Sequence, residues 1–451
     1  MRKPSDPPDD NRKSAVPSSR LGRLWALSSM ASNMAARGLV QRAQRGKNPG
    51  DSKVPQWLTV DNARIMADRL SHLRGAAMKL GQMISMHGDQ LLPREFADAL
   101  GKLRSQADTM PTAQVHQVLR DAYGDNWRDR FAELDAEPIA SASIGQVHRA
   151  QAQDGRVVAL KIQYPGVAES IDSDVDNLAS LVSLGRMLPS GVDLRGVLEE
   201  LKRQLRAETD YVQEAHNAAT YAERLAGEPG FRVPTVHLDL TTPRTLAMDF
   251  VACPNLFTWA DDATQDERDE IARRLVTLTL RELLWYRLSQ TDPNLGNYLW
   301  DTEQREIVLL DFGATQEVPT HVSQNYADVL QAAMASDHQA MRRALIAAGA
   351  LDRELNEDNQ AFYTDVALEA TSLIREAKPH NFGEDDLLHR MRGWAKEGLK
   401  RGKPLRSPPA EITFFQRKLG GTYLMCKRLK ARVDCRTICE QVLQQAGYLT
   451  A

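Results

Sequence analysis

The 451-residue sequence lacks any run of 18 apolar residues, so it predicts no transmembrane helix. It has four cysteines, too few for a disulfide framework in a chain of this length, which favours a reducing compartment. Cys435 and Cys439 lie four residues apart, but no second Cys or His pair lies near them. We therefore predict buried thiols there, and not a metal site.

The sequence also lacks a strong charge of either sign. Its formal net charge is −3, which gives no overall attraction to nucleic acid, and we expect no nucleic-acid partner. Charged residues make up 26% and hydrophobic residues 42%, a balance typical of a globular chain. The length allows two or three domains. Residues 1–19, rich in Pro, Ser, Asp and Lys, predict a disordered tail without the apolar segment of a secretory signal.

Residues 20–47 predict a basic amphipathic helix. Apolar residues recur at helical spacing around Trp25, and arginines surround them. The first 50 residues hold ten Lys and Arg against three Asp, a local net charge of +7. Such a helix can lie on an anionic membrane surface. The alternative is a helix packed on its own domain, with its basic residues solvated.

Residues 58–105 also predict helices, because apolar residues recur there at a spacing near 3.6. This segment contains Lys79-Leu-Gly81-Gln82 in an Ala-rich context. The pattern alone indicates no catalytic role. It equally suits a close helix crossing at the small residues, with Lys79 exposed.

Residues 131–164 predict strands, with a hairpin turn at Asp154-Gly155. The first strand segment reads A-x-A-x-x-G-x-V, the phosphate loop of protein kinases with two glycines replaced by alanine. The next strand carries Lys161 in the place of the lysine that contacts the α- and β-phosphates. Alanine restricts positive φ and close backbone approach, so this loop is expected to handle nucleotide differently. The predicted nucleotide-binding residues are Ala140, Ser141, Ala142, Ser143, Gly145, Val147 and Lys161.

Residues 290–313 carry the strongest signal. Asp292 and Asn297 have the D-x-x-x-x-N spacing of a kinase catalytic loop, and an Asp-Phe-Gly motif beginning at Asp311 follows fourteen residues later, behind an apolar run. Asp292 would orient a nucleophile and accept its proton. Asn297 and Asp311 would supply hard oxygen ligands to Mg²⁺. Each motif alone is weak, and the two in order are much stronger.

Residues 165–226 predict helices with several acids. A kinase needs one glutamate to pair with the strand lysine. Glu208 and Glu214 are six residues apart, about 240° around one helix, so they cannot both face one target. One can face Lys161 and the other a second basic partner, or either can be solvent-exposed. Further along, residues 231–251 predict paired strands, residues 252–289 helices, and residues 320–451 an almost wholly helical region.

These motifs together resemble the UbiB-like atypical kinases, whose eukaryotic members support coenzyme Q biosynthesis. Five segments carry the resemblance: Lys79–Gln82 (K-x-G-Q), Ala140–Gln146, Lys161–Gly166, Glu208–Asp210 (E-x-D) and Gln290–Asn294. In that family the K-x-G-Q motif belongs to an N-terminal helical extension, a lid over the site where a protein kinase holds its peptide. The resemblance implies that Glu208 and Asp210 pair with Lys79 and Gln82, and that Glu214 is the partner of Lys161.

Two features depart from many family members. Bacterial members often end in transmembrane helices, which this sequence lacks, so it looks more like the mitochondrial-type branch. Position 294 is Asn where many members have His. The second difference leaves the predicted role of Asp292 unchanged.

The sequence thus predicts an α+β, bilobal protein-kinase-like fold with an N-terminal helical lid and a mostly helical C-lobe. The expected divisions are residues 1–50 (tail and basic helix), 51–125 (lid), 126–251 (N-lobe) and 252–451 (C-lobe). The predicted catalytic residues are Asp292, Lys161 and Glu214, with ATP and Mg²⁺ as cofactors and Asn297 and Asp311 as metal ligands.

The expected function is ATP hydrolysis, or phosphorylation of a small or lipid-associated molecule, in support of ubiquinone biosynthesis. Expected partners are ATP, quinone-pathway lipid intermediates or enzymes, and an anionic membrane surface. The expected location is the cytoplasm, with peripheral attachment to the inner face of the membrane as an addition. The alternatives are a nucleotide-binding pseudokinase scaffold and a conventional protein kinase. The lid and the lack of an A-P-E motif argue against the protein kinase.

Overall fold

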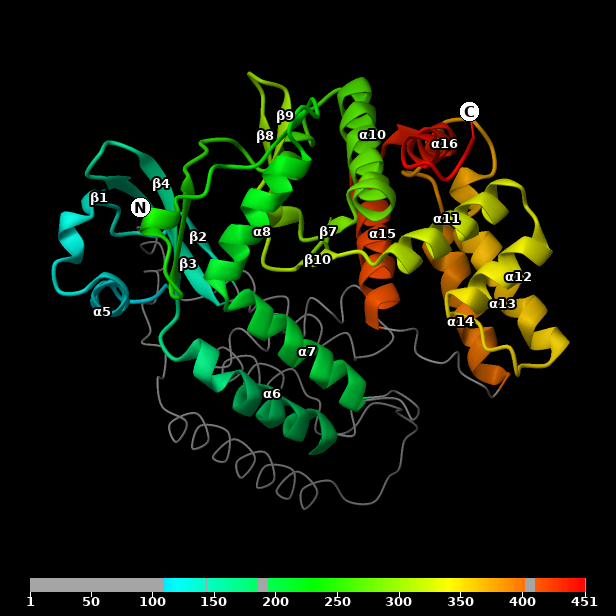
Figure 1. The fold of residues 1–451 in the computed structure, drawn as a ribbon, viewed down its shortest axis with the longest axis horizontal. Helices are drawn as coiled ribbons and strands as arrows, with labels where there is room; N and C mark the ends of the chain where they lie inside the picture. The colour runs from blue at the N-terminus through cyan, green and yellow to red at the C-terminus, as the bar shows by residue number, and fades with distance from the viewer. Residues whose placement is uncertain (1–108, 143, 185–193, 402–409, 451) are drawn as a thin grey trace, which may run out of the picture. The chain divides into compact units, whose positions relative to one another are not determined.

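A computed structural model describes residues 109–142, 144–184, 194–401 and 410–450 (Figure 1). The predicted tail and basic helix lie outside the described residues, as do Ser143 and residues 51–108 of the predicted lid, with Lys79 and Gln82. Residues 109–125, the rest of the predicted lid, are described and include a helix at Thr112–Tyr123. The chain divides into two compact units. The first unit comprises Met1–His216 and Thr235–Val251, and the second comprises Asn217–Pro234 and Ala252–Ala451.

The first unit is built on an antiparallel sheet of order β1-β3-β4-β6, with β2 paired to β3. Its strands are β1 (Phe131–Leu134), β2 (Ala140–Ser141), β3 (Gly145–Ala152), β4 (Val157–Gln163) and β6 (Thr245–Asp249). Its helices are α5 (Thr112–Tyr123), α6 (Val167–Leu184), α7 (Leu194–Glu208) and the start of α8 (Tyr211–Arg224). Figure 1 shows α6 and α7 lying side by side.

One face of this sheet is covered by α5. Residues Val115, Val118 and Leu119 of α5 fall on one helix face and are buried together with Val158 and Leu160 of β4. The helix begins after Pro111, and its cap Gly124 has φ +85°, a left-handed conformation that glycine adopts without strain. Each such buried aliphatic side chain contributes about 1.5–3 kcal/mol. This core holds β4, the strand that carries Lys161.

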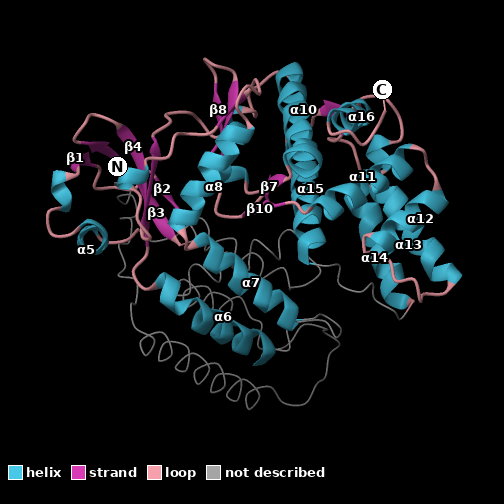
Figure 2. Cartoon of the chain, viewed as in Figure 1, coloured by secondary structure: helices cyan, strands magenta, loops and turns pink. Residues whose placement is uncertain are grey.

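The second unit contains a three-stranded sheet of order β5-β9-β8 and a two-stranded pair, β7 and β10. The strands are β5 (Phe231–Arg232), β7 (Leu288–Gln290), β8 (Tyr298–Asp301), β9 (Glu306–Leu309) and β10 (Thr315–Glu317). Two further short strands, β11 (His380–Asn381) and β12 (Arg432–Val433), pair with each other. Figure 2 shows these strands as short segments between helices.

Helices make up most of the second unit. They are α9 (Leu256–Trp259), α10 (Gln265–Arg281), α11 (Thr320–Met334), α12 (His338–Ala347), α13 (Glu357–Ala370), α14 (Leu387–Lys400), α15 (Ala410–Arg428) and α16 (Cys435–Gln445), with a π-helical segment η4 (Glu282–Tyr286) after α10. A capping box begins α10, because the Thr264 side chain accepts from Glu267 N–H while the Glu267 carboxylate accepts from Thr264 N–H.

The strands of residues 131–164 and the helical character of residues 252–289, 320–401 and 410–450 were correctly predicted. Within residues 231–251 the two strands do not pair with each other, and the segment's two halves are linked by an isolated antiparallel bridge of Val236 with Met248. β5 joins β9 of the second unit, whereas β6 joins β4 of the first. Strand type is a local property, but a strand's partner is decided by which distant segment reaches its edge.

All four cysteines are free thiols. Cys435 and Cys439 are buried, as predicted, and burial raises the pKa of each to about 12. Among the described residues, no three His, Cys, Asp or Glu side chains come together as a metal cluster. Across the described ranges, no helix combines the length and apolarity needed to cross a bilayer.

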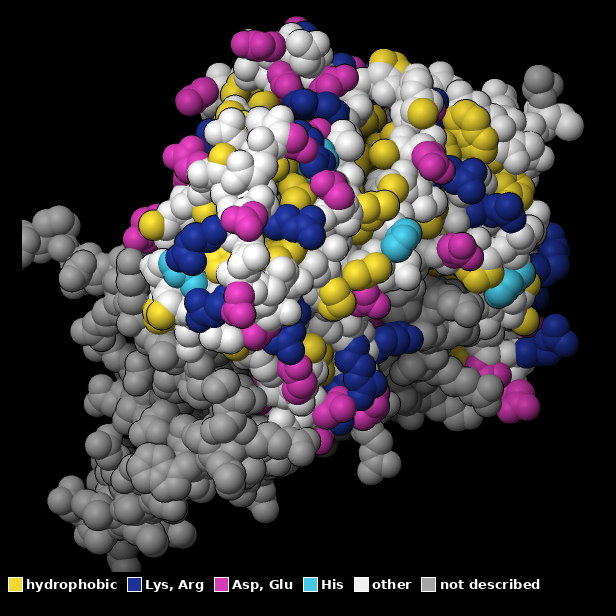
Figure 3. Space-filling model, turned by 60° about the vertical axis from the view of Figure 1, so that its left-hand side comes forward, with side chains coloured by type: hydrophobic (Ala, Val, Ile, Leu, Met, Phe, Trp, Pro, Cys, Tyr) yellow, Lys and Arg dark blue, Asp and Glu magenta, His cyan; other side chains and the backbone are white. Residues whose placement is uncertain are grey.

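Acidic and basic side chains of the described residues are interspersed on the face drawn in Figure 3, with apolar side chains between them. Several exposed pairs meet at short range, such as Arg156 with Asp239 and Arg428 with Asp261, both at 2.6 Å. Exposed pairs of this kind contribute about 0–1 kcal/mol each. The described part of this face therefore has no broad field of one sign.

A buried chain of hydrogen bonds fixes the protonation state of His148. Met110 N–H donates to Gln146 Oε1 at 2.9 Å, so the Gln146 amide nitrogen faces His148 Nε2 at 2.7 Å. That ring nitrogen must accept, and Nδ1–H then donates to Asp135 O at 2.8 Å. Burial lowers the pKa of His148, against smaller opposing effects of the Asp135 carbonyl and nearby carboxylates.

This chain predicts a pH-dependent stability. Because the folded pKa of His148 lies below the unfolded value of about 6.5, the unfolded chain binds more protons and stability falls as pH falls below about 6.5. We expect the Tm of His148→Gln to drop less than the wild-type Tm between about pH 7.5 and about pH 5.5. Differential scanning calorimetry at both pH values measures this. The exposed His389 supplies the control, His389→Gln, and a His148→Gln slope equal to the control's contradicts the assignment.

Candidate active site

Lys161 occupies the central strand of the first unit's sheet. The register pairs Lys161 with Val147 on β3 and with Leu246 on β6. Its ammonium Nζ lies 3.0 and 2.9 Å from the two carboxylate oxygens of Glu214, and 4.8 Å from the centre of the Tyr211 ring. The Lys161 side chain is 16% exposed and that of Glu214 1%. The ammonium is therefore fixed in position yet remains accessible.

The start of α8 positions Glu214. The Asp210 side chain accepts from Gln213 N–H at 3.0 Å, and the Asp210 carbonyl accepts from Glu214 N–H at 2.9 Å. A carboxylate at a helix N-terminus satisfies backbone donors that have no partner within the helix. Asp210 therefore caps the helix that holds the lysine's partner, a contact the sequence motif did not indicate.

The helical argument for the two glutamates was wrong in its premise. Glu208 is the last residue of α7 and Glu214 lies in α8, which begins at Tyr211. The break between them makes the angle of a single helix inapplicable. Glu214 is the acid in contact with Lys161, as the family resemblance implied. The pairing of Glu208 and Asp210 with Lys79 and Gln82 stays a prediction, because the latter two lie outside the described residues.

The alanine-rich loop is held as a tight hairpin. Ala140 pairs with Val147, and Ser141 with Gln146, across β2 and β3. Ala142 N–H donates to Gly145 O at 2.8 Å. A Cβ on Gly145 would lie 2.4 Å from the Ile162 carbonyl oxygen, so glycine is required there by the approach of β4. Its conformational freedom is not the reason.

The predicted metal ligands lie at one end of the β8–β9 hairpin. Tyr298 pairs with Leu309, and the hairpin turn lies at the far end, after Asp301. Asn297 immediately precedes β8, and Asp311 follows β9 by two residues. Leu310 N–H also donates to Asn297 O at 3.1 Å. Two residues fourteen apart in sequence are thus brought to the same edge by an antiparallel hairpin.

The Asp-Phe-Gly segment is anchored by its phenylalanine. Phe312 is fully buried, with its ring centroid 5.1 Å from that of Tyr221. Its carbonyl accepts from the Asn217 amide at 3.0 Å. Asp311 Oδ1 accepts from Gly313 N–H at 3.0 Å. The buried ring therefore fixes the segment in place, while Asp311 remains partly exposed.

The catalytic-loop backbone is tied down on both sides of Asp292. Thr291 donates twice to Ala314 O, from its N–H at 3.1 Å and its Oγ1 at 2.7 Å. The Gln290 amide donates to Asp292 O at 2.8 Å. On the far side, Asn294 Oδ1 accepts from Gly296 N–H at 3.1 Å. Asn294 thus has a local structural role that requires no histidine.

A buried ion pair behind this loop was not expected from the sequence. Lys418 Nζ of α15 lies 3.0 Å from Glu282 Oε2 and 3.5 Å from Gln290 Oε1. Glu282 also accepts from the Tyr221 hydroxyl and from Ser289 Oγ. Glu282 is fully buried and Lys418 is 5% exposed. Burial alone lowers the pKa of Lys418, but the Glu282 carboxylate and its neighbours outweigh it and raise that pKa.

Two neighbours of Lys418 on α15 also contact the loop. Arg417 Nε donates to Thr291 O at 3.1 Å. A Cβ on Gly421 would lie 2.1 Å from Pro293 Cβ, so only glycine permits this approach. More than 120 residues separate the two segments. In the sequence, the one local sign of this contact is the pair Gly420 and Gly421 within a helical pattern. Glycine inside a helix often indicates close packing against another segment.

The residues present fit a magnesium ion bound together with phosphates. Asp311 and Asn297 offer a carboxylate and an amide oxygen, which are hard donors suited to Mg²⁺. The side-chain amide nitrogen of Asn297 is buried without a hydrogen-bond partner among the described residues, so a bound group with an acceptor, such as a phosphate or water, would satisfy it. Two protein ligands suffice for Mg²⁺ when phosphates and water complete its shell.

Comparison with known proteins shows which family this sequence and fold resemble. Residues 102–345 match the ABC1 atypical kinase-like domain. The chain is 36% identical over 438 residues to a rat protein named atypical kinase COQ8B, mitochondrial, covering 95% of this chain and 81% of the relative. It is 31% identical to the Saccharomyces cerevisiae atypical kinase COQ8, mitochondrial, covering 96% and 87% respectively. The solved Mycobacterium tuberculosis Rv3197–erythromycin complex superposes with a TM-score of 0.60 at 26% identity, covering 83% of this chain and 93% of that one.

The fold and site therefore define an atypical kinase-like protein. The chain belongs to the ABC1, or UbiB-like, atypical kinase family, and its relatives include the COQ8 proteins. The predicted kinase-like α+β fold with a mostly helical C-lobe is confirmed. The roles assigned to individual site residues stay predictions.

The Glu282–Lys418 pair predicts a specific pattern of stability. Lys418→Met leaves a buried carboxylate unpaired and should cost about 3–5 kcal/mol of unfolding free energy. The double variant with Glu282→Gln should lose less unfolding free energy than the sum of the two single variants, because Glu282→Gln removes the carboxylate charge that Lys418→Met leaves unpaired. Urea unfolding measures all three. The exposed Lys400–Glu397 pair is the control, and Lys400→Met should change stability by about 0–1 kcal/mol. Strict additivity of the buried pair would refute the coupling.

Proposed function

We propose that the chain is a Mg²⁺- and ATP-dependent atypical kinase or ATPase that supports ubiquinone biosynthesis. The observation that carries this proposal is the contact of Lys161 with both carboxylate oxygens of Glu214, at 3.0 and 2.9 Å. A lysine and a glutamate in this arrangement are what phosphoryl transfer from ATP requires. The quinone pathway is inferred from the COQ8 relatives and the motifs shared with their family.

Each residue has a distinct role in this proposal. Lys161 neutralises phosphate charge, and Glu214 keeps its ammonium in place. Asn297 and Asp311 hold Mg²⁺, which supplies charge neutralisation at the phosphates when bound. Asp292 orients the attacking oxygen and accepts its proton. Because water or a substrate hydroxyl can occupy that position, hydrolysis and transfer share one set of residues.

The hairpin of Ala140–Ala142 adds a constraint on nucleotide handling. Alanines in place of glycines restrict how closely its backbone approaches phosphate. In the proposed mechanism the lid residues Lys79 and Gln82, paired with Glu208 and Asp210, keep a protein substrate out. This favours a small or lipid-associated acceptor, or water. The basic segment of residues 20–47 would bring the enzyme to an anionic membrane.

The proposal is tested first at Asp311. Asp311→Asn removes the charged ligand of Mg²⁺ and should lower metal-dependent phosphate release from ATP by about 10²–10³-fold. The exposed Asp328 gives the matched control Asp328→Asn, with unchanged turnover. ATP turnover is assayed first without any acceptor other than water, and then with membranes and quinone-pathway intermediates added. The comparison separates hydrolysis from transfer. Turnover that survives in folded Asp311→Asn would remove the metal assignment. ATP binding without turnover in the wild type would favour the pseudokinase scaffold.

Gly421 tests whether the position of Asp292 matters. A methyl group there displaces Pro293, the residue after Asp292, and misplacement by about 1 Å costs on the order of 100-fold in rate. We expect Gly421→Ala to lower kcat by about that factor, with ATP affinity largely retained. The neighbouring Gly420 has open space around it, so Gly420→Ala should behave as wild type. Equal kcat values for the two variants would show that the loop does not require this approach.

A further inference from the structure

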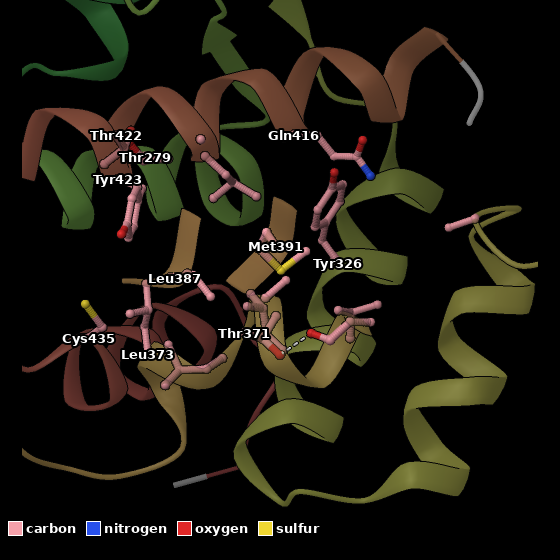
Figure 4. Close-up of a pocket in the computed structure, with 18 of the residues that line it drawn as sticks. Thr279, Tyr326, Thr371, Leu373, Leu387, Met391, Gln416, Thr422, Tyr423 and Cys435 are labelled. Atoms are coloured by element: carbon pink, nitrogen blue, oxygen red, sulfur yellow. Dashed lines mark hydrogen bonds between the residues drawn. The ribbon is translucent and has the colours of Figure 1, made fainter. Parts of the chain in front are cut away.

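A cavity of about 700 Å³ lies among helices α10 to α16 of the second unit (Figure 4). Its volume falls within the range of small-molecule sites, about 300–1,000 Å³. Most of its wall consists of aliphatic and aromatic side chains from these helices. Among the described residues that line it, none is charged. The cavity is thus a hydrocarbon-lined space within the C-terminal helices, built from residues that the proposed mechanism does not use.

The polar groups of the wall are few, and several are already paired. The Thr279 and Thr422 hydroxyls lie 2.8 Å apart, so one donates to the other, and the accepting hydroxyl can donate to a backbone carbonyl of its own helix. Thr371 Oγ1 donates to Ala367 O at 2.8 Å. Figure 4 draws Gln416, which also lines the cavity, away from the Thr279 and Thr422 pair. Gln416 is exposed, so its amide marks the solvent-facing end.

An apolar space of this size is unfavourable when empty. Protein interiors hold few voids larger than a water molecule, and water in an apolar cavity finds too few hydrogen-bond partners. A charged ligand would lose its hydration without gaining a counter-charge from this wall. The suitable occupant is therefore uncharged, mostly hydrocarbon, and has at most a hydroxyl or carbonyl group, placed at the solvent-facing end marked by Gln416.

The helix α15 connects this cavity to the catalytic loop. Gln416, Leu419 and Tyr423 recur at helical spacing and line the cavity. On the opposite face of the same helix, Lys418 and its neighbours Arg417 and Gly421 hold residues 290–293. A ligand that packs against the first face therefore contacts the helix whose other face fixes the position of Asp292. Closely packed elements transmit such displacements, because the interior has low compressibility.

We propose that this cavity binds an uncharged, largely aliphatic small molecule, and that α15 transmits its binding to the catalytic loop. The binding part stands independently of the proposed function. The effect of binding on turnover rests on that function, whereas its effect on loop motion does not.

Binding is tested on the full-length chain with dodecan-1-ol, and with dodecanoate as the charged molecule of equal chain length. Calorimetric titration should give saturable binding of the alcohol, and affinity for the carboxylate at least about tenfold weaker. Ala367→Trp fills the cavity from α13 and should weaken alcohol binding at least about tenfold. Ala361→Trp, on the exposed side of the same helix, should leave it unchanged. Val329→Trp on α11 replaces Ala367→Trp if circular dichroism shows that the latter is unfolded.

Transmission is tested by hydrogen exchange of the peptide that spans residues 290–297, measured with and without dodecan-1-ol. We expect at least about a twofold change in exchange rate in the wild type and none in Ala367→Trp. Addition of dodecan-1-ol should likewise change the kcat for ATP in the wild type and leave it unchanged in Ala367→Trp.

Equal affinities for alcohol and carboxylate, or alcohol binding unaffected in a folded cavity-filling variant, would overturn the site. Unchanged exchange at saturating alcohol would overturn the transmission, whether or not the chain hydrolyses ATP. Changed exchange in a chain without ATP turnover would leave this inference intact and count only against the proposed function.

Discussion

The buried pair of Glu282 and Lys418 is the interaction on which the second unit's site depends. Both charges lie out of water, so each is tolerable only while the other is present. The pair joins η4, which leads into β7, to α15, which lies far along the chain. Through Gln290 it also reaches the segment that carries Asp292. The backbone around Asp292 is thus fixed by a helix that has no part in the recognised motifs.

The protein fixes the positions of two charged side chains, Lys161 and Asp311, in different ways. Lys161 is held by a carboxylate whose helix begins at the cap Asp210. Asp311 is held by the burial of its neighbour Phe312 and by the hydrogen bond from Gly313 N–H to its Oδ1. The first means sets the position of a cation that must remain accessible. The second leaves an anion at an edge with its oxygens directed by the backbone.

Much of the site was predictable because its motifs combine local pattern with short spacing. The register of one hairpin is enough to bring Asn297 and Asp311 to the same edge, and the match to the kinase phosphate loop and its following strand lysine located Lys161. The choice between Glu208 and Glu214 was not predictable from helical angle, because a break at Asp210 separates α7 from α8. The partner of β5 was also missed, since edge pairing depends on segments about 75 residues away. Gly145 was assigned to nucleotide approach, but it also serves the close packing of β4.

The sequence by itself determined the class of fold, the family, and the residue types available for chemistry, because these follow from periodicity, composition and motif spacing. Only the tertiary structure decided which residues support that chemistry from a distance. Lys418, Arg417 and Gly421 carry no motif, and their contacts to residues 290–293 exist only once α15 is packed in place. The cavity on the other face of α15 is likewise a property of packed helices. Burial and approach distances depend on the whole fold, so no local pattern encodes them.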